Sequence, residues 1–277
     1  MSIYLFLNQT YIFFKKIADW CAAHLFYSLF AIFLLGLFLK VLVWLGTAGV
    51  SRDGALYLQM IQTLHDTGSY SEVLRQYPHQ GWIPPMYIYL ASSVMRLGAD
   101  AEFSGVLVNI LLGSLLPFVG YFIVYNVTEN KKISLVSALF LAVNPAVTTL
   151  SVEVQREISF LFFVGCSLGL FFYGVRKQRW YCFCGTGVFL ALAMLTRYET
   201  GEFILLLPAG IIFLAAMRKL TLKTALSGVA GIVFSFVIVF VAFIYFTGNI
   251  SLLDRYKNYF SVKYKTVEEK ITESGGK

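Results

Sequence analysis

Hydrophobic positions along the chain are gathered into long runs that contain almost no charge. Seven such runs cover residues 26–46, 104–125, 133–150, 158–175, 180–196, 202–217 and 225–247. A helix needs about 20 apolar residues to cross a hydrocarbon core about 30 Å thick. The pattern therefore predicts an all-α polytopic membrane protein with about seven transmembrane helices, of which the fifth and sixth are short.

The long connection between the first two runs, about residues 49–103, shows a different pattern. Apolar residues recur every three or four positions from Tyr57 to Leu64, which is the spacing of one face of an amphipathic helix. Ser51 or Asp53 can cap the start of this helix, and Gly68 can end it. The pattern predicts a helix that lies on the membrane surface.

A second amphipathic stripe follows in the same connection, from Tyr87 to Val94. Pro84 and Pro85 suit the first turn of a helix, where a missing backbone N–H costs nothing, and Gly98 can close it. Two such juxtamembrane helices would form a roof over a cavity between the spans. We therefore expect residues 49–103 to be the catalytic loop of a transmembrane module that covers residues 1–247.

The two ends of the chain have different compositions. Residues 1–25 combine apolar and aromatic positions with Lys15 and Lys16, which is typical of an amphipathic helix at the cytoplasmic membrane surface. No short apolar core with a small-residue cleavage site follows, so a signal peptide is not predicted. Residues 248–277 are polar and form an expected outer tail without a further span.

The charge distribution predicts the orientation. The chain is 58% hydrophobic and 13% charged, with a formal net charge of +7. Its basic residues concentrate in the N-terminal segment and in every second connection, namely Lys15, Lys16, Lys131, Lys132, Arg176, Lys177, Arg179, Arg218, Lys219 and Lys223. Lys and Arg favour cytoplasmic loops, so the N-terminus is predicted to be cytoplasmic and the 49–103 loop to face the periplasm of a bacterial inner membrane. The positive charge is thus a topology signal, and no nucleic-acid module accompanies it.

The four cysteines carry little functional signal. Cys182 and Cys184 are spaced too closely for a zinc site and lack further ligands. Cys21 and Cys166 lie in apolar stretches, so all four are interpreted as packing residues.

Candidate chemistry lies in four clusters on the predicted outer side. They are Ser51–Gly54, the 77–85 segment with His79 and Trp82, Glu153–Glu157, and Thr196–Glu199. The charged residues Glu153, Arg156 and Glu157 have the spacing of a single helix face, which is where we expect them.

Three of these clusters place an arginine beside a carboxylate. A carboxylate can take a proton from an acceptor, and arginines can hold a phosphate with their fork of N–H donors. Each pair taken singly is also compatible with a solvated loop end or a structural ion pair. Asp53 is the strongest candidate because it begins an amphipathic helix within the long loop.

These residues together resemble a family. The segments Arg52–Leu58, Trp82–Tyr87, Glu153–Glu157 and Leu195–Glu199 are similar to those of the GT-C-fold membrane glycosyltransferases. The closest groups are the protein-mannosyltransferase-like and lipid A aminoarabinose-transferase-like proteins. The resemblance covers about residues 26–217, and its strongest element is the acid that follows the first span within a two-helix outer loop.

The resemblance implies an inverting glycosyltransferase that moves a sugar from a polyprenyl-phosphate donor to a periplasmic-side lipid, glycan or protein acceptor. Asp53 matches the family's first-loop catalytic aspartate, and Glu157 is the second candidate catalytic carboxylate. The expected donor-phosphate ligands are Arg52, Arg156 and Arg197, and the expected substrate-lining residues are Tyr57, His79, Trp82, Glu153 and Glu199.

Some expectations stay open at this stage. No metal site is predicted, and a divalent cation would need Asp53, Glu153 and Glu157 to converge, because hard cations take several oxygen ligands. Members of the family usually continue with further spans, so the chain is a fragment, a minimal member or a module that acts with a partner subunit. The alternative function is a non-catalytic membrane subunit, a transporter or a lipid flippase built on the same module. A transporter would be expected to show repeated halves, and none is evident.

Overall fold

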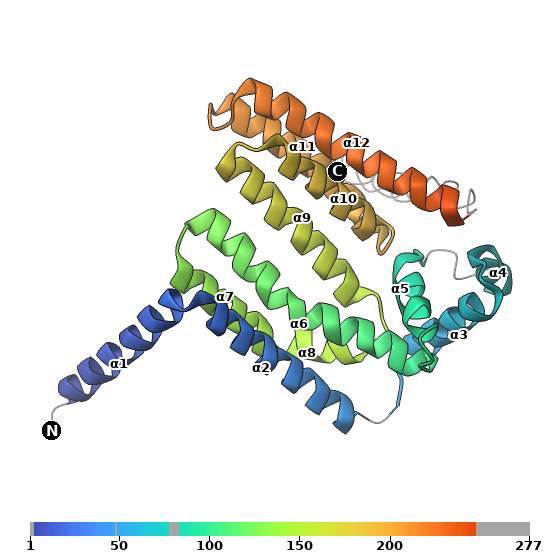
Figure 1. Cartoon of the computed structure of the whole chain (residues 1–277), viewed down its shortest axis with the longest axis horizontal. Helices are drawn as coiled ribbons and strands as arrows, with labels where there is room; N and C mark the ends of the chain where they lie inside the picture. The colour runs from blue at the N-terminus through green and yellow to red at the C-terminus, as the bar shows by residue number, and fades with distance from the viewer. Residues whose placement is uncertain (1–2, 48, 78–82, 248–277) are drawn as a thin grey trace, which may run out of the picture.

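The computed structural model describes residues 3–47, 49–77 and 83–247, and every regular element in these ranges is helical (Figure 1). In chain order the elements are α1 (Ile3–Ala23), α2 (Leu25–Gly46), α3 (Arg52–Thr67), α4 (Tyr70–Gln76), α5 (Met86–Met95), α6 (Ala101–Thr128), α7 (Lys131–Val143), α8 (Pro145–Val152), α9 (Glu157–Lys177), α10 (Trp180–Met194), the short 3₁₀ helix η2 (Tyr198–Thr200), α11 (Gly201–Ala216) and α12 (Leu222–Thr247). The predicted all-α membrane fold is confirmed.

Each of the seven apolar runs forms helix, although not every run is one straight span. Among the described residues, five helices are long and apolar enough to cross a membrane, namely α2, α6, α9, α12 and the unit formed by η2 and α11. A sixth span results if the bent pair α7 and α8 crosses as one element. The remaining run forms α10, whose 15 residues extend only about 22 Å.

The third apolar run bends by 48° between α7 and α8. Asn144 has extended backbone dihedrals, as expected for a residue that precedes a proline. Its side chain accepts a hydrogen bond from the Val147 N–H at 3.1 Å and so caps α8. Pro145, in the first turn, cannot donate a hydrogen bond back to α7. The local sequence therefore ends one helix and starts the next.

The short helix α10 packs against α9 and α12, and small residues bring it close to α12. A Cβ atom added at Gly187 would lie 2.2 Å from the Ile232 carbonyl oxygen and from the Ser235 hydroxyl. Ser235 in turn donates a hydrogen bond of 2.7 Å to the Cys184 carbonyl. Small residues allow this close backbone approach, which is the usual basis of helix association in a membrane.

The first predicted amphipathic helix is confirmed as α3. The Ser51 hydroxyl accepts a hydrogen bond from the Gly54 N–H at 3.1 Å, and Gly68 ends the helix in the left-handed conformation. Its apolar face is fully buried at Met60, Ile61 and Leu64, which belong to the largest core cluster. Burying a side chain of this size stabilises the fold by about 1.5–3 kcal/mol.

The second predicted surface helix is α5, and a third helix, α4, lies between the two. Gly98, in the left-handed region at φ +97°, follows α5 as predicted. The helix α4 was not predicted, because its seven residues are too few to show a period. The Tyr70 hydroxyl at its start donates a hydrogen bond of 2.7 Å to the Ile83 carbonyl, which ties α4 to the segment before α5.

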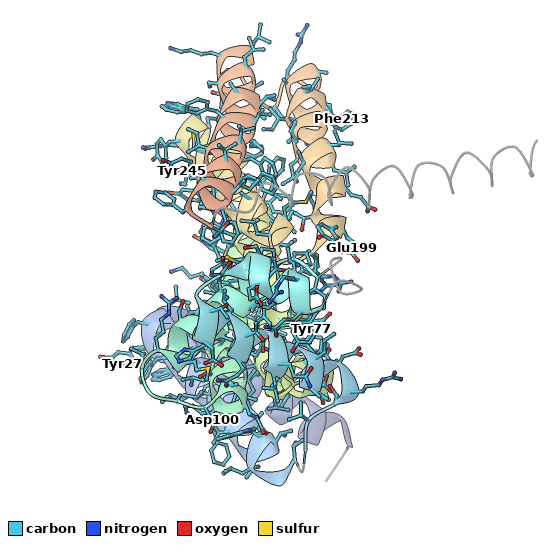
Figure 2. The ribbon with its side chains drawn as sticks, turned by 90° about the vertical axis from the view of Figure 1, so that its right-hand side faces the viewer. Tyr27, Tyr77, Asp100, Glu199, Phe213 and Tyr245 are labelled. Carbon is cyan, nitrogen blue, oxygen red and sulfur yellow. The ribbon has the colours of Figure 1, made fainter. Side chains whose placement is uncertain are left out.

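The two ends of the helix bundle differ in what they carry. Figure 1 shows α3, α4 and α5 together at the right, next to the first turns of α6 and α9 and the end of α10. The connections with the basic residues, α6–α7, α9–α10 and α11–α12, lie at the opposite end. Figure 2 looks directly at the first end, with α3 to α5 in front and Tyr77, Asp100 and Glu199 labelled. We call this the α3–α5 end.

Candidate active site

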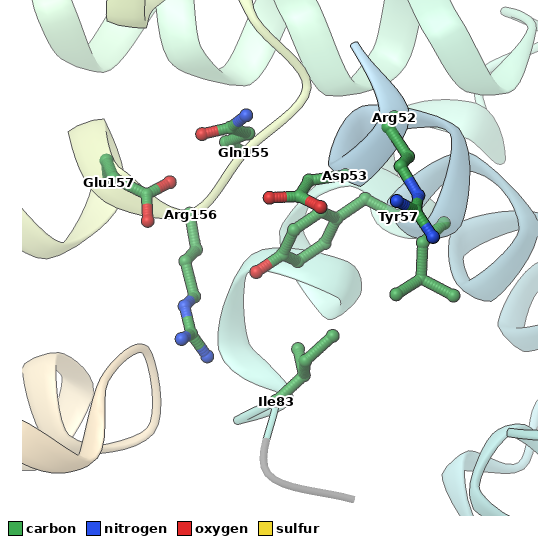
Figure 3. A pocket seen from close by; sticks show the side chains of 8 residues that line it. Arg52, Asp53, Tyr57, Ile83, Gln155, Arg156 and Glu157 are labelled. Carbon is green, nitrogen blue, oxygen red and sulfur yellow. The ribbon is translucent and has the colours of Figure 1, made fainter. Parts of the chain in front are cut away.

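A cavity of about 450 Å³ opens at the α3–α5 end (Figure 3). Its lining comes from the start of α3, the segment before α5 and the turn between α8 and α9. The lining residues are Arg52, Asp53, Leu56, Tyr57, Ile83, Gln155, Arg156 and Glu157. Residues about one hundred positions apart in the sequence therefore meet around one space.

The first turn of α3 supplies Arg52 and Asp53. Both side chains are exposed to the cavity side, and Asp53 lies in the first turn of the helix, where the helix dipole favours a negative charge. The cap by Ser51 fixes the direction in which this turn leaves the preceding loop. In Figure 3 the Asp53 carboxylate points towards the turn that carries Arg156 and Glu157.

Tyr57 follows Asp53 by one helical turn and is buried, with 5% of its surface exposed. Burial raises the pKa of the Tyr57 hydroxyl well above its usual value, and nearby Glu157 and Asp53 act in the same direction against the opposing effect of Arg156. The hydroxyl therefore stays protonated at neutral pH. It can act as a hydrogen-bond donor in the cavity.

The turn between α8 and α9 corrects one prediction. We expected Glu153, Arg156 and Glu157 to share a helix face, but α8 ends at Val152 and α9 begins at Glu157. Glu153 has an extended backbone and lies apart from Arg156 and Glu157, which both line the cavity. The physical reason is that this segment connects two helices and does not continue either.

Glu153 consequently lies on another, smaller cavity, together with Trp44 and Glu102. The carboxylates of Asp53, Glu153 and Glu157 do not converge on a common point. Within residues 3–47, 49–77 and 83–247, no group of three or more His, Cys, Asp or Glu side chains could hold a metal ion.

Asn109 of α6 fixes the shape of this turn. Its side-chain amide donates to the Glu153 carbonyl at 2.7 Å and to the Gln155 carbonyl at 2.6 Å, and it lies 3.4 Å from the Tyr87 hydroxyl. Asn109 is completely buried. Sequence analysis missed this residue, although an amide within the apolar run 104–125 is a signal that could have identified it.

Gln155 connects the turn to α3. Its side-chain amide donates to the Ser51 hydroxyl at 3.3 Å, so it contacts the same oxygen that caps α3. Gln155 also lines the cavity. It was not predicted as a site residue, because an uncharged amide in a loop carries no distinctive sequence signal.

Arg156 and Glu157 form the wall opposite α3. Arg156 is buried, with 7% of its surface exposed, and still lines the cavity. One Glu157 oxygen lies 3.6 Å from a guanidinium nitrogen of Arg197, and the other accepts no hydrogen bond from any described residue. Glu157 thus links the cavity to the third predicted cluster.

Arg197 lies between two carboxylates. It contacts Glu157, and its fork of N–H groups donates to both Glu199 oxygens at 3.0 and 3.4 Å. The hydrogen bonds to Glu199 raise the pKa of Arg197, so the guanidinium stays charged. Its position is fixed by the backbone, because the Met86 N–H of α5 donates to the Leu195 carbonyl at 2.8 Å.

The structure thus gathers most of the predicted site residues. Arg52, Asp53, Tyr57, Arg156 and Glu157 line the cavity. Arg197 adjoins it through Glu157, and Glu199 is the further partner of Arg197. His79 and Trp82 lie outside the described residues.

This arrangement combines fixed positive charge with an accessible carboxylate. Arg156 lines the cavity with a planar guanidinium of the kind that binds phosphate, and Asp53 places a carboxylate on the facing wall. Arg197 adjoins the cavity with its fork bound to Glu199. The sequence profile of the dolichyl-phosphate-mannose-protein mannosyltransferases matches residues 83–246. The chain belongs to this family.

This mannosyltransferase-family protein is therefore a membrane glycosyltransferase that depends on a lipid-phosphate-linked sugar. The matched region contains Arg156, Glu157 and Arg197, whereas α3 with Asp53 precedes it. No curated protein sequence matches the chain significantly.

Proposed function

We propose that this family member transfers a sugar from a polyprenyl-phosphate donor to an acceptor by a single displacement with inversion. The observation that carries the proposal is the cavity at the α3–α5 end, where Asp53 faces Arg156 and Glu157 from a separate element. A base and a phosphate-binding group on opposite walls leave the sugar carbon between them.

In the proposed step, the Asp53 carboxylate takes the proton from the acceptor hydroxyl or amine. The acceptor oxygen or nitrogen forms a bond to the anomeric carbon, while the bond from that carbon to the phosphate oxygen breaks. The lipid phosphate leaves with the electron pair of the broken bond. Arginines that meet its charge make protonation of the leaving group unnecessary.

The donor phosphate is proposed to bind Arg156 and Arg197, with Arg52 contributing from the α3 wall. Glu157 and Glu199 hold the Arg197 guanidinium in place. Because this long side chain is already ordered, it loses less conformational entropy when the phosphate binds. The Tyr57 hydroxyl is proposed to donate a hydrogen bond to the sugar.

The reaction is proposed to take place on the periplasmic side of a bacterial inner membrane. The support is that the Lys- and Arg-rich connections lie at the end of the bundle opposite the cavity. The proposed acceptor is a lipid, a glycan or a protein. Turnover by the purified chain alone would show that no partner subunit is obligatory.

The proposal is tested by replacing Asp53 with Asn. The amide keeps the shape of the side chain but cannot take a proton, so we expect kcat to fall by roughly 10²- to 10⁴-fold. The matched control is Asp66→Asn at the other end of α3, where the exposed carboxylate accepts hydrogen bonds from Gln62 and from no other described residue. Sugar transfer from a polyprenyl-phosphate donor would be measured with purified protein in nanodiscs.

Wild-type turnover of Asp53→Asn would remove this residue from the mechanism. Glu157→Gln would then test the second carboxylate of the cavity. The stereochemistry of the product is a separate criterion, since retention at the anomeric carbon would contradict a single displacement.

A further inference from the structure

A second hollow lies at the opposite end of the bundle from the cavity. It is a groove of about 810 Å³ between α1, α2 and α7. Its walls are formed by residues such as Ile17, Ala31, Leu35, Val136 and Leu139. The sugar-transfer site does not use it.

The groove presents an almost entirely apolar surface. The Ser28 hydroxyl in its lining donates inward to the Cys21 and His24 carbonyls, at 3.1 Å each. Ala18 and Ala31 leave space where larger side chains would fill it. Chain-like apolar ligands fit such a surface better than polar ones, because burial of hydrocarbon supplies the free energy.

The rim of the groove is basic. Lys132 lines it and pairs with Asp19 of α1, and Lys15, Lys16 and Lys131 are exposed nearby on the same two helices. The pKa of Asp19 is lowered by its hydrogen bond to Lys132 and also by the charge of Lys15, which places Lys15 near this rim. The two helices thus carry four lysines and the carboxylate of Asp19 near this rim, while Glu129 lies 3.9 Å from Arg176.

Two exposed aromatic residues mark the depth of the groove in the membrane. Trp20 and Tyr27 both line it, and more than half of each residue's surface is exposed. Trp and Tyr concentrate at the level of the lipid headgroups. The apolar walls thus begin at that level and continue towards the hydrocarbon core, with the lysines on the headgroup side.

We propose that the groove between α1, α2 and α7 binds an anionic phospholipid. One acyl chain lies along the apolar walls, and the phosphate lies among Lys15, Lys16 and Lys131, beside the Lys132–Asp19 pair. The lipid fills the angle between α1 and the bundle and fixes α1 against α2 and α7. This binding site is independent of the sugar-transfer proposal, because it lies at the other end of the spans.

The test uses the purified full chain and native mass spectrometry of retained lipid, with vesicle-derived phosphatidylglycerol compared with phosphatidylcholine. The triple variant Lys15→Gln, Lys16→Gln, Lys131→Gln leaves the Lys132–Asp19 pair intact. Each basic residue near an anionic membrane surface contributes roughly a factor of five. We therefore expect the triple variant to bind phosphatidylglycerol on the order of a hundredfold more weakly.

The matched control is Lys177→Gln, Arg179→Gln, Lys219→Gln, which removes the same charge from the same end of the bundle but away from the groove. We expect it to retain phosphatidylglycerol. Ala31→Phe should exclude the acyl chain while all charges remain. If this variant does not purify as a single species, the two triple variants decide the question.

Equal binding of phosphatidylcholine and phosphatidylglycerol would overturn the proposal, since the groove would then only be filled by bulk lipid. An equal loss in both triple variants would also overturn it, because the effect would then reflect overall charge and not this site.

Discussion

The charged side chains around the cavity differ in whether they form ion pairs with neighbouring residues. Arg197 is held by Glu157 and Glu199, whereas Asp53 is exposed and makes no ion pair with a described residue. A carboxylate locked in an ion pair is a poor base, because the pair favours its charged form. In the proposed mechanism the exposed Asp53 therefore takes the proton, and Glu157, which is paired with Arg197, has a positioning role.

Arg156 should contribute chiefly to donor binding. A hydrogen bond to a charged group contributes about 1.5–3 kcal/mol, so Arg156→Ala is expected to weaken donor affinity by about 10- to 100-fold. The exposed Arg96, also at the α3–α5 end, provides the control Arg96→Ala, which should bind normally. Affinity would be measured by titration with polyprenyl-phosphate sugar, together with the thermal transition of each variant. Unchanged affinity in Arg156→Ala would assign this residue a structural role only.

At the scale of elements, the turn between α8 and α9 determines the site. It carries Arg156 and Glu157 to the cavity, and Asn109 and Gln155 connect it to α6 and α3. The neighbouring Gly105 adds a steric constraint, because a Cβ there would lie 2.8 Å from a Val154 methyl group. The turn is thus fixed by tertiary contacts and not by its own helical propensity.

Asn109→Asp is expected to displace this turn. The new carboxylate would face the Glu153 and Gln155 carbonyls without an N–H to donate, at a cost of about 1–3 kcal/mol in stability. Because Arg156 moves with the turn, the donor KM should rise at temperatures well below Tm. Steady-state kinetics and thermal unfolding would be measured on the same preparations.

The matched control for Asn109 is Asn126→Asp at the other end of α6. Asn126 is also buried, but within the described part of the chain its amide donates to a single acceptor, the Phe122 carbonyl of its own helix, at 2.7 Å. It should lose some stability and keep the wild-type KM. Identical effects of the two substitutions on KM would argue against a positioning role for Asn109.

At the scale of the whole molecule, the two ends of the bundle serve different purposes. One end carries the cavity beside α3 and the segment before α5, and the other carries the basic connections and the groove between α1, α2 and α7 that we propose to bind lipid. A protein that meets a lipid-linked donor on one side of the membrane needs such an asymmetry. The apolar helices between the two ends fix the distance from the cavity to the opposite surface.

The proposed orientation predicts which connections are accessible from the periplasm. In a background with the four native cysteines replaced by Ala, Ser71→Cys on α4 should react with an impermeant maleimide added to intact cells. Lys177→Cys at the opposite end should react only after the membrane is permeabilised. The reverse labelling pattern would place the cavity in the cytoplasm and contradict the proposed periplasmic reaction.

The sequence by itself determined the helical class, the approximate position of the seven apolar runs and the caps of α3. These features are local, because apolar period and capping depend on neighbouring residues. In the membrane, the backbone N–H and C=O groups of a span must form hydrogen bonds within that span, which makes a long apolar run helical. Ser51 and Gly68 begin and end α3 as their residue types indicate.

Only the tertiary structure decided which residues share the cavity. Asp53 and Arg156 line one cavity because α3 packs on α5 and α6 and because Asn109 holds the turn between α8 and α9. The spacing of Glu153, Arg156 and Glu157 had predicted a helix where this turn lies. The separation of Glu153 from the cavity has the same origin. Such contacts join segments far apart in the chain, so no local pattern encodes them, and their geometry follows from how whole helices pack.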